Sequence, residues 1–318
     1  MNYVPPSRLA ELEESATLKA SEKANQMIAS GLKVYKLDVG EPDFLTPRRI
    51  IDAAYRAMLD GYTHYAPSAG GGVPVEIDTG SGFLPDSSEL RKRIGRKTKA
   101  LIVNSPNNPT GAVYDEKTVK ELSDLARENN LFIISDEIYD RLVYEGDYIS
   151  FRKHMKYEDG LILVNGFSKA YAMTGWRLGY VIADEKIVKE MAKIQGHTAT
   201  SPSTFVQIAA VTALRECEED VRKMVSEFSE RRKIIIEMLD RKGIEYSRPR
   251  GAFYFFIDMS KYIKGVDPAE YLLEKARVSV TSGSGFGDGY RTYIRISYAT
   301  SRDTIIEGMN NIFAAIGV

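Results

Sequence analysis

The sequence predicts an α/β protein with a mainly parallel sheet between helices, joined to a smaller α+β domain. Between residues 99 and 195, strand-like segments alternate with helical ones, and those strands are apolar on both faces. Strands of this kind occur in parallel sheets that helices cover on both sides. Beyond residue 250, strands follow one another with fewer helices, a pattern that favours the α+β class.

The N-terminal region predicts two helices around one strand. Residues 15–30 form a polar amphipathic pattern that ends at Gly31, a residue common at helix C-termini. The strand VYKLDVG follows it. Thr46 and Pro47 then occupy the N-cap and first-turn positions of a helix that runs to Gly61.

The later elements are read from the same periodicities. Residues 203–242 form a charged helical tract too long for one ordinary globular helix, which indicates either a domain-linking helix or a bent pair. In chain order the other elements are the strand KALIVNS, a helix over 116–129, the strands LFIISD, LILVNGF and RLGYVIA, the helix DEKIVKEMAKIQ, the strand AFYFFID, the helix DPAEYLLEKAR, the strand VSVT, the loop SGSGFGDG, the strand YRTYIRISYA and a helix from Arg302.

The length predicts two domains, since 318 residues is about twice the ~150 residues typical of one domain. We expect a large α/β domain over residues 48–215. Residues 1–47 and 216–318 are expected to form the small domain together.

Composition and charge exclude several classes of protein. Apolar residues make up 43% and charged residues 27% of the chain, which is ordinary for a globular protein and unlike a disordered one. The net charge of -1 gives no basic field for nucleic acid. No apolar run approaches the ~20 residues of a membrane span, and the N-terminus lacks a signal-peptide pattern. The single cysteine, Cys217, is compatible with a reducing compartment. From the charge, the short apolar runs and this cysteine we expect a cytoplasmic protein without membrane or nucleic-acid partners. The three histidines lack metal-ligand spacing, and no metal is expected.

Four polar residues follow the ends of predicted strands: Asn108, Asp136, Tyr139 and Lys169. Taken singly, such residues have structural explanations: Asn108 as a turn residue, Asp136 as a helix N-cap and Lys169 as a solvated loop lysine. The carboxyl ends of the strands in such a sheet meet at one rim, where ligands bind. Together the four residues therefore predict a site at that rim.

From residue 37 onward the sequence resembles a known family, the fold-type I pyridoxal-phosphate-dependent aminotransferases of class I/II, in the branch of the bacterial and archaeal aspartate aminotransferases. The stretches that carry the resemblance are LDVGEPDF, THYAPSAG, NSPNNPTGAVY, SDEIYDRLVYEG, SKAYAMTGWRLGY, GAFYFF and YIRISYATS, in family order. The resemblance implies that fold, with a mainly parallel sheet of the seven-stranded type, and pyridoxal 5'-phosphate as cofactor.

The resemblance also implies roles around the cofactor. Lys169 matches the lysine that holds the cofactor as a Schiff base and then carries the proton between the substrate Cα and the cofactor, with Ser168 beside it as a cofactor-binding residue. Asp136 matches the carboxylate that keeps the pyridine nitrogen protonated. Tyr139 and Asn108 match the residues that hydrogen-bond the phenolic oxygen, and Asn108 also lies on the substrate side.

Further matches concern the phosphate and the substrate. Arg177 matches the arginine that binds the cofactor phosphate, and Tyr65 matches a tyrosine that reaches the phosphate of the neighbouring subunit. The latter implies a homodimer with shared active sites. Arg295 matches the arginine that grips the α-carboxylate of the substrate. Gly40 would let the backbone approach the same carboxylate without a clash.

The chain departs from the family after THYAPSAG. Gly70 runs directly into Gly71, and the sequence that follows resembles a stretch about sixty to seventy residues further along the family pattern. The loop that wraps the cofactor phosphate and the residue that stacks on the ring have no counterpart. Either the sequence joins two stretches of a longer chain or the protein lacks the segment. Since its loss should expose a buried sheet face, we favour the first, which an intact mass above 35.6 kDa would support.

We therefore predict an aminotransferase that moves an amino group from an L-amino acid, with aspartate as the first candidate, to a 2-oxo acid such as 2-oxoglutarate by a ping-pong mechanism. Aromatic amino acids and alanine stay open as donors. A C–S lyase of the same fold and a non-catalytic binding relative are the alternatives from other classes.

Overall fold

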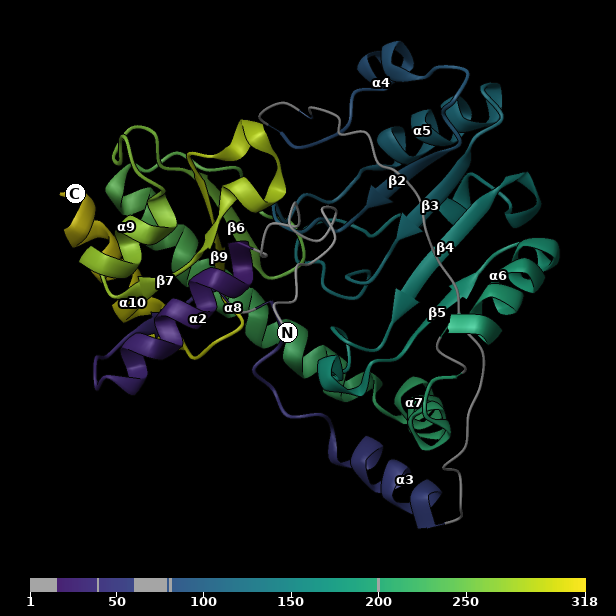
Figure 1. The fold of residues 1–318 in the computed structure, drawn as a ribbon, viewed down its shortest axis with the longest axis horizontal. Coiled ribbons are helices and arrows are strands. Elements are labelled where there is room, and N and C mark those ends of the chain that lie inside the picture. Colours follow the sequence, from purple (N-terminus) through teal and green to yellow (C-terminus); the bar gives the residue numbers. More distant parts are fainter. Residues whose placement is uncertain (1–15, 39, 60–78, 80–81, 199–200) are drawn as a thin grey trace, which may run out of the picture. The chain divides into compact units, whose positions relative to one another are not determined.

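The structure is a computed structural model that describes residues 16–38, 40–59, 79, 82–198 and 201–318. The chain forms two compact units (Figure 1). Unit 1 contains the described residues up to Gly40 together with 234–246 and 255–318, and unit 2 contains 41–233 and 247–254. Helix α8 (Glu218–Lys242) runs unbroken from unit 2 into unit 1, so no break in the chain marks a boundary there. The predicted domain ranges stay a prediction.

Unit 2 contains the sheet that the sequence predicts. In the order β2-β3-β4-β5, the first three strands are parallel and the last is antiparallel. The strands are β2 (Ala100–Asn104), β3 (Phe132–Asp136), β4 (Leu161–Gly166) and β5 (Gly179–Ile182). Among the described residues this sheet has four strands, fewer than the seven-stranded type that the resemblance implies.

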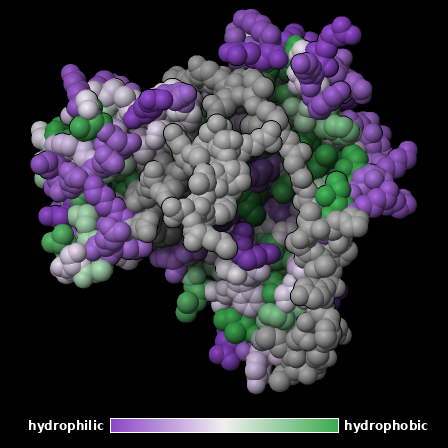
Figure 2. All heavy atoms as spheres, in the orientation of Figure 1, coloured by the Kyte–Doolittle hydropathy of each residue, from purple (hydrophilic) through white to green (hydrophobic). Residues whose placement is uncertain are grey.

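One face of this sheet packs against α5 (Glu116–Glu128), in a core that contains Leu101, Ile133 and Leu161 from three successive strands. The sequence predicts cover on both faces. On the opposite face, however, Ile102 of β2 is 69% exposed and Phe132 of β3 is 42% exposed. In Figure 2 hydrophobic atoms are visible over the strands, between the hydrophilic surfaces of the neighbouring helices. Within the described part of the chain, the expectation of two covered faces is thus met on the α5 side only.

The sequence predicts most of the remaining helices of unit 2, but not α4 (Ser87–Arg93). α5 begins after Asp115, whose carboxylate accepts a hydrogen bond from the Thr118 N–H at 2.8 Å. The predicted long tract is a bent pair, because the helix is interrupted at Cys217. The helices are α3 (Arg48–Leu59), α4 (Ser87–Arg93), α6 (Glu185–Thr198), α7 (Thr204–Glu216) and the first part of α8, with short 3-10 helices η1 (Phe151–Lys153), η2 (Tyr157–Asp159) and η3 (Thr174–Trp176).

The described residues of unit 1 form two small sheets and three α-helices besides the end of α8. The predicted strand VSVT is divided, because Val278 and Ser279 pair with β1 whereas Thr281 and Ser282 pair with β9. The elements are α2 (Ala16–Ala29), β1 (Tyr35–Lys36), β6 (Tyr254–Asp258), α9 (Pro268–Lys275), β7 (Val278–Ser279), β8 (Thr281–Ser282), η4 (Gly283–Phe286), η5 (Asp288–Tyr290), β9 (Tyr293–Ser297) and α10 (Arg302–Ile316). Throughout the described ranges, no helix is both long and apolar enough to cross a membrane.

Candidate active site

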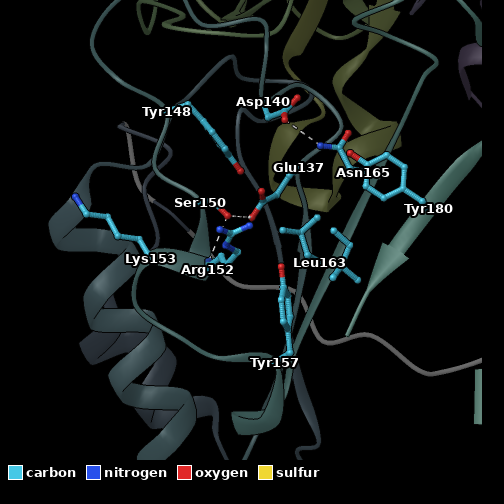
Figure 3. Close-up of a pocket in the computed structure, with 11 residues that line it drawn as sticks. Glu137, Asp140, Tyr148, Ser150, Arg152, Lys153, Tyr157, Leu163, Asn165 and Tyr180 are labelled. Carbon is cyan, nitrogen blue, oxygen red and sulfur yellow. Dashed lines mark hydrogen bonds between the residues drawn. The ribbon is translucent and has the colours of Figure 1, made fainter. Parts of the chain in front are cut away.

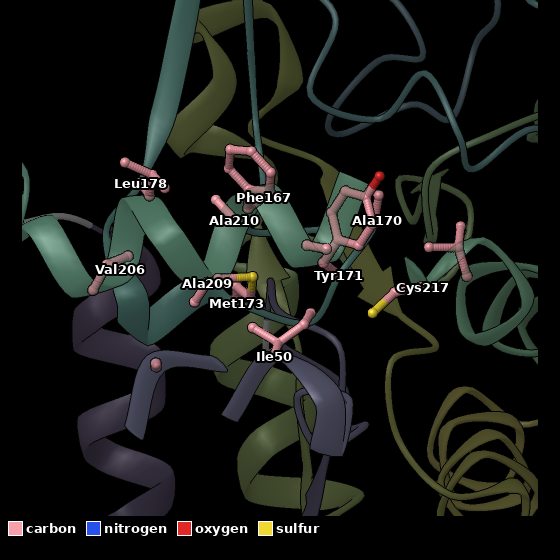
Figure 4. Close-up of a cluster of buried hydrophobic side chains, with 13 residues drawn as sticks. Ile50, Phe167, Ala170, Tyr171, Met173, Leu178, Val206, Ala209, Ala210 and Cys217 are labelled. Atoms are coloured by element: carbon pink, nitrogen blue, oxygen red, sulfur yellow. The ribbon is translucent and has the colours of Figure 1, made fainter. Parts of the chain in front are cut away.

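Lys169 lies in the loop between β4 and β5 of unit 2, and its neighbours in the sequence anchor that loop. Phe167, Ala170 and Met173 are buried, while Lys169 itself is half-buried. They pack into an apolar cluster with side chains of α3 and α7, as Figure 4 shows. The amine is therefore carried by a loop whose flanks are fixed in the core, which favours a single position for it.

The backbone of this loop is tight. The N–H of Met173 donates to the carbonyl of Ser168 at 3.2 Å, and Ala172 has a positive φ of 51°, which a residue with a Cβ seldom adopts. Thr46, expected as the N-cap of α3, donates its hydroxyl hydrogen to the carbonyl of Ala172 at 2.6 Å. This hydrogen bond joins the start of α3 to the turn that follows Lys169.

Asn108 and Asp136 come together through the ends of the paired strands β2 and β3. The Oδ1 atom of Asn104 accepts from the Asn108 N–H at 2.9 Å, and its Nδ2 atom donates to the Asp136 carbonyl at 3.2 Å. The following turn is held by Asn107, whose Oδ1 atom accepts from the Thr110 hydroxyl at 2.7 Å. Asn104 thus ties the Asn108 loop to the strand end that carries Asp136.

The Asp136 carboxylate is close enough to Lys169 for their charges to interact. Burial raises the pKa of Asp136 above its usual value, whereas the N–H of Ile138 and the positive charge of Lys169 lower it. The Ile138 N–H donates to its Oδ1 atom at 3.1 Å. A half-buried carboxylate of this kind is suited to pair with a cationic group.

Tyr139 is buried just after β3, near the same lysine. The Lys169 ammonium lies 5.8 Å from the centre of the Tyr139 ring and 5.9 Å from that of Phe253. The hydroxyl of Tyr139 is 2.9 Å from that of Tyr254. Unit 2 therefore places Asp136 and Tyr139 near Lys169, and Asn104 ties the Asn108 loop to the strand end that carries Asp136.

The chemistry of this donor set fits pyridoxal phosphate. An amine can bind an aldehyde carbon, a carboxylate can hold a protonated pyridine nitrogen, and phenol and amide groups can donate to a phenolic oxygen. All four groups come from one unit. For the described residues, no cluster of three or more histidine, cysteine, aspartate or glutamate side chains is arranged to bind a metal.

Arg295 lies in unit 1, on β9, and is only 4% exposed. Its Nη2 atom donates to the carbonyl of Asp38 at 3.0 Å and to the Thr281 hydroxyl at 3.1 Å. Its guanidinium carbon lies 5.4 Å from the ring centre of Phe286. A buried guanidinium held in this way is pre-organised to bind a carboxylate.

The other predicted residues have different settings. Arg177 is exposed after η3, and its Nη1 atom donates to the Thr174 carbonyl at 2.8 Å. Ser168 is half-buried beside Lys169, and Gly40 is half-buried in unit 1. Tyr65 lies outside the described residues. The phosphate and substrate roles of these residues stay predictions.

A separate pocket of about 500 Å³ lies on the α5 side of the sheet (Figure 3). Leu163 and Asn165 line it from β4, whereas Asp136 belongs to the opposite set of alternating side chains. Burial raises the pKa of Asp140 in this pocket to about 6, against a hydrogen bond from the Asn165 amide at 3.0 Å. The pocket contains none of the four grouped residues.

Sequence reasoning missed Asn104 and Tyr254 as parts of this site. Asn104 is the last residue of β2, directly before the turn motif, and that position could have indicated it. Tyr254 falls in GAFYFF, where a run of aromatic residues gave no sign of which ring faces a polar partner.

Comparisons with known proteins agree with this geometry. Residues 60–312 match the family model of aminotransferases of class I and II. An aspartate aminotransferase of Pyrococcus horikoshii is 34% identical over 390 residues, with 99% of this chain and 97% of that protein covered. A probable aspartate/prephenate aminotransferase of Aquifex aeolicus is 33% identical over 389 residues, covering 98% of each.

A solved structure is similar as well. The aspartate aminotransferase of Thermus thermophilus with maleate has a TM-score of 0.88 and 32% identity, and the match covers 98% of this chain and 100% of that one. The Pyrococcus alignment spans 390 positions, 72 more than the 318 residues of this chain, so those relatives carry residues without counterparts here. Matched over most of its length by family, relatives and fold, the chain belongs to the aminotransferases of class I and II.

Proposed function

We propose that the protein is a pyridoxal-phosphate-dependent aminotransferase that takes the amino group of L-aspartate and passes it to a 2-oxo acid such as 2-oxoglutarate. The observation that carries the proposal is the grouping of Lys169 with Asp136, Tyr139 and Asn108 at adjoining strand ends. The choice of aspartate is supported by the names of the Pyrococcus and Aquifex relatives. It is also supported by the similar Thermus structure, which is of an aspartate aminotransferase with maleate, a dicarboxylate.

Lys169 would bind the cofactor and move the proton. Bound pyridoxal phosphate supplies an aldehyde carbon for the amino group and a ring that accepts electrons from the substrate Cα. In its neutral form the Lys169 Nζ atom would take the proton from the substrate Cα and carry it to the bound cofactor. The packed flanks of the loop keep this amine within reach of one position.

The neighbouring side chains would hold protons in place. Asp136 accepts from the protonated ring nitrogen, and a charged partner there offsets the burial that otherwise raises the carboxyl pKa. Tyr139 and Asn108 donate to the phenolic oxygen. Arg177, Ser168 and the partner's Tyr65 would bind the phosphate, which makes a homodimer the active form.

Arg295 would bind the α-carboxylate of the amino acid. Its two bonds to Asp38 and Thr281 hold the guanidinium in one orientation before substrate arrives. Gly40 would present backbone to the same carboxylate. We retain the cytoplasm as the expected compartment.

Replacing Lys169 by alanine tests the proposal. Purified protein with added pyridoxal phosphate should show a visible absorption band that L-aspartate alone converts to the band of the amino form. We expect Lys169→Ala to lose this conversion and about 10²- to 10⁴-fold in kcat, because the variant lacks the amine that we propose moves the proton.

A matched control is Lys193→Ala, which removes an exposed lysine of α6 and should leave turnover unchanged. Transamination at the normal rate by Lys169→Ala would refute the proposal. Release of pyruvate and ammonia from cysteine or a similar substrate would instead indicate the lyase activity.

A further inference from the structure

Two buried tyrosines of unit 2 share a hydrogen bond. Tyr139 follows β3 and Tyr254 begins β6, 115 positions later, yet their hydroxyl oxygens are 2.9 Å apart. Both side chains are almost completely buried. Each hydroxyl has one hydrogen to donate, so the direction of this bond decides which oxygen still has a hydrogen for another acceptor.

Aromatic packing fixes the two rings. Their centroids are 6.0 Å apart with planes at 81°, and Phe253 lies edge-on to Tyr139 at 5.5 Å. Phe253 in turn packs against Phe228 of α8, with ring centroids 5.3 Å apart and planes tilted by 31°. With rings held on several sides, neither hydroxyl can move far from the other.

Backbone hydrogen bonds place Tyr254 in register with the rest of the site. The N–H groups of Arg250 and Gly251 both donate to the carbonyl of Gly111, in the turn that also carries Asn108. The Ala252 N–H donates to the carbonyl of Leu142, three residues beyond Tyr139. The segment that leads into Tyr254 is therefore fastened to both loops that carry cofactor residues.

We propose that Tyr254 is a positioning residue that donates its hydroxyl hydrogen to Tyr139 and so directs the Tyr139 hydrogen to the phenolic oxygen of the cofactor. The inference rests on the proposed function. The charged groups facing this pair are the Lys169 ammonium, 5.8 Å from the Tyr139 ring centre, and Asp136, which interacts with that lysine. A donated hydrogen bond makes Tyr139 a stronger donor in turn, because bonds in such a chain polarise one another.

The test is the pH dependence of the visible spectrum of the cofactor bound at Lys169. Tyr254→Phe removes the hydrogen bond that orients and polarises the Tyr139 hydroxyl, so Tyr139 should donate a weaker hydrogen bond to the phenolic anion. The weaker bond should raise the pH midpoint of the spectral change by about 0.3 to 1 unit. Tyr139→Phe should raise it further. In the double variant, Tyr254→Phe should add nothing, since it acts through Tyr139.

Tyr114→Phe is the matched control, because Tyr114 is a buried tyrosine in the α5 core and its loss of a hydroxyl should leave the midpoint unchanged. An unaltered midpoint in Tyr254→Phe, or an equal shift in the Tyr139→Phe background, overturns the inference. If the unmutated protein forms no visible band at all, it is the proposed function that fails.

Discussion

The two faces of the β2–β5 sheet are alike in sequence but unlike in cover. On the α5 face, Ile133 is fully buried, whereas on the opposite face Ile102 of the neighbouring strand is 69% exposed. Both faces carry large apolar side chains, as expected of strands that lie between two layers. An apolar sheet face left exposed to water is costly and prone to association. The difference indicates that the described residues lack a layer that would cover this second face.

The length comparison supports this interpretation. The Pyrococcus aminotransferase aligns over 72 positions more than this chain has residues. The predicted junction between Gly70 and Gly71 lies outside the described residues. We propose that a segment at that junction covers the exposed face in the complete fold.

The largest expected effect is a loss of stability that differs between the two faces of the sheet. Ile133→Ala should destabilise the 318-residue chain by about 2 to 5 kcal/mol, because it opens a cavity in the α5 core. Ile102→Ala, the matched change on the other face, should cost less than about 0.5 kcal/mol. Urea unfolding of both variants measures the contrast. A loss of several kcal/mol in Ile102→Ala would mean that this face is covered in solution.

How far the sequence predicts the site depends on how far apart in the sequence the contacting residues lie. Lys169, Asp136, Asn108 and Tyr139 follow strand ends, and parallel strands bring their ends together, so topology alone groups them. The contact of Tyr139 with Tyr254 could not be read in this way, because it joins elements 115 positions apart through two hydroxyl groups.

Element boundaries show the same limit. The helical tract breaks at Cys217, which is neither proline nor glycine, so no local signal chose between a straight helix and a bent pair. VSVT has one strand-like pattern, but its two halves pair with different strands. Pairing is a tertiary property that periodicity does not contain.

A smaller effect on stability is expected in the pocket on the α5 side of the sheet, which Asp140 lines (Figure 3). Burial raises its pKa from 3.8 to about 6, so the native state holds this proton more tightly than the unfolded chain does. Its contribution to stability is complete below pH 3.8 and is lost as the pH rises to about 6. Asp140→Asn, which has no proton to lose, should be more stable than the unmutated protein at pH 7.

The gain should be about 1 to 2 kcal/mol, below the ~3 kcal/mol that the full shift would give, because the side chain is only partly buried. Urea unfolding at pH 4 and pH 7 measures it. The amide oxygen of the variant can still accept from Asn165, so the packing is retained. Equal pH dependence of the two proteins between pH 4 and 6 would show that Asp140 is solvated and that the pocket is open.

The smallest effect concerns the start of the helix that covers the buried face. Asp115 caps α5 by accepting from the Thr118 N–H, and this bond holds the pKa of Asp115 below its usual value. Asp115→Ala should cost about 1 kcal/mol, because the first turn loses an acceptor for its free N–H groups. Asp115→Asn keeps an acceptor oxygen and should cost only a few tenths of that.

The difference in stability between these two variants should depend on pH. Because the pKa of Asp115 is lowered in the folded state, its ionised carboxylate stabilises the fold fully above pH 3.8. This stabilisation is lost as the pH falls through the lower folded-state pKa. Asp115→Ala should therefore differ most from the unmutated protein at neutral pH, in the free energy of unfolding from urea titration. If the alanine variant were as stable as the asparagine variant at every pH, the start of α5 would not be limiting, and the stability of the covered face would come from its apolar core alone.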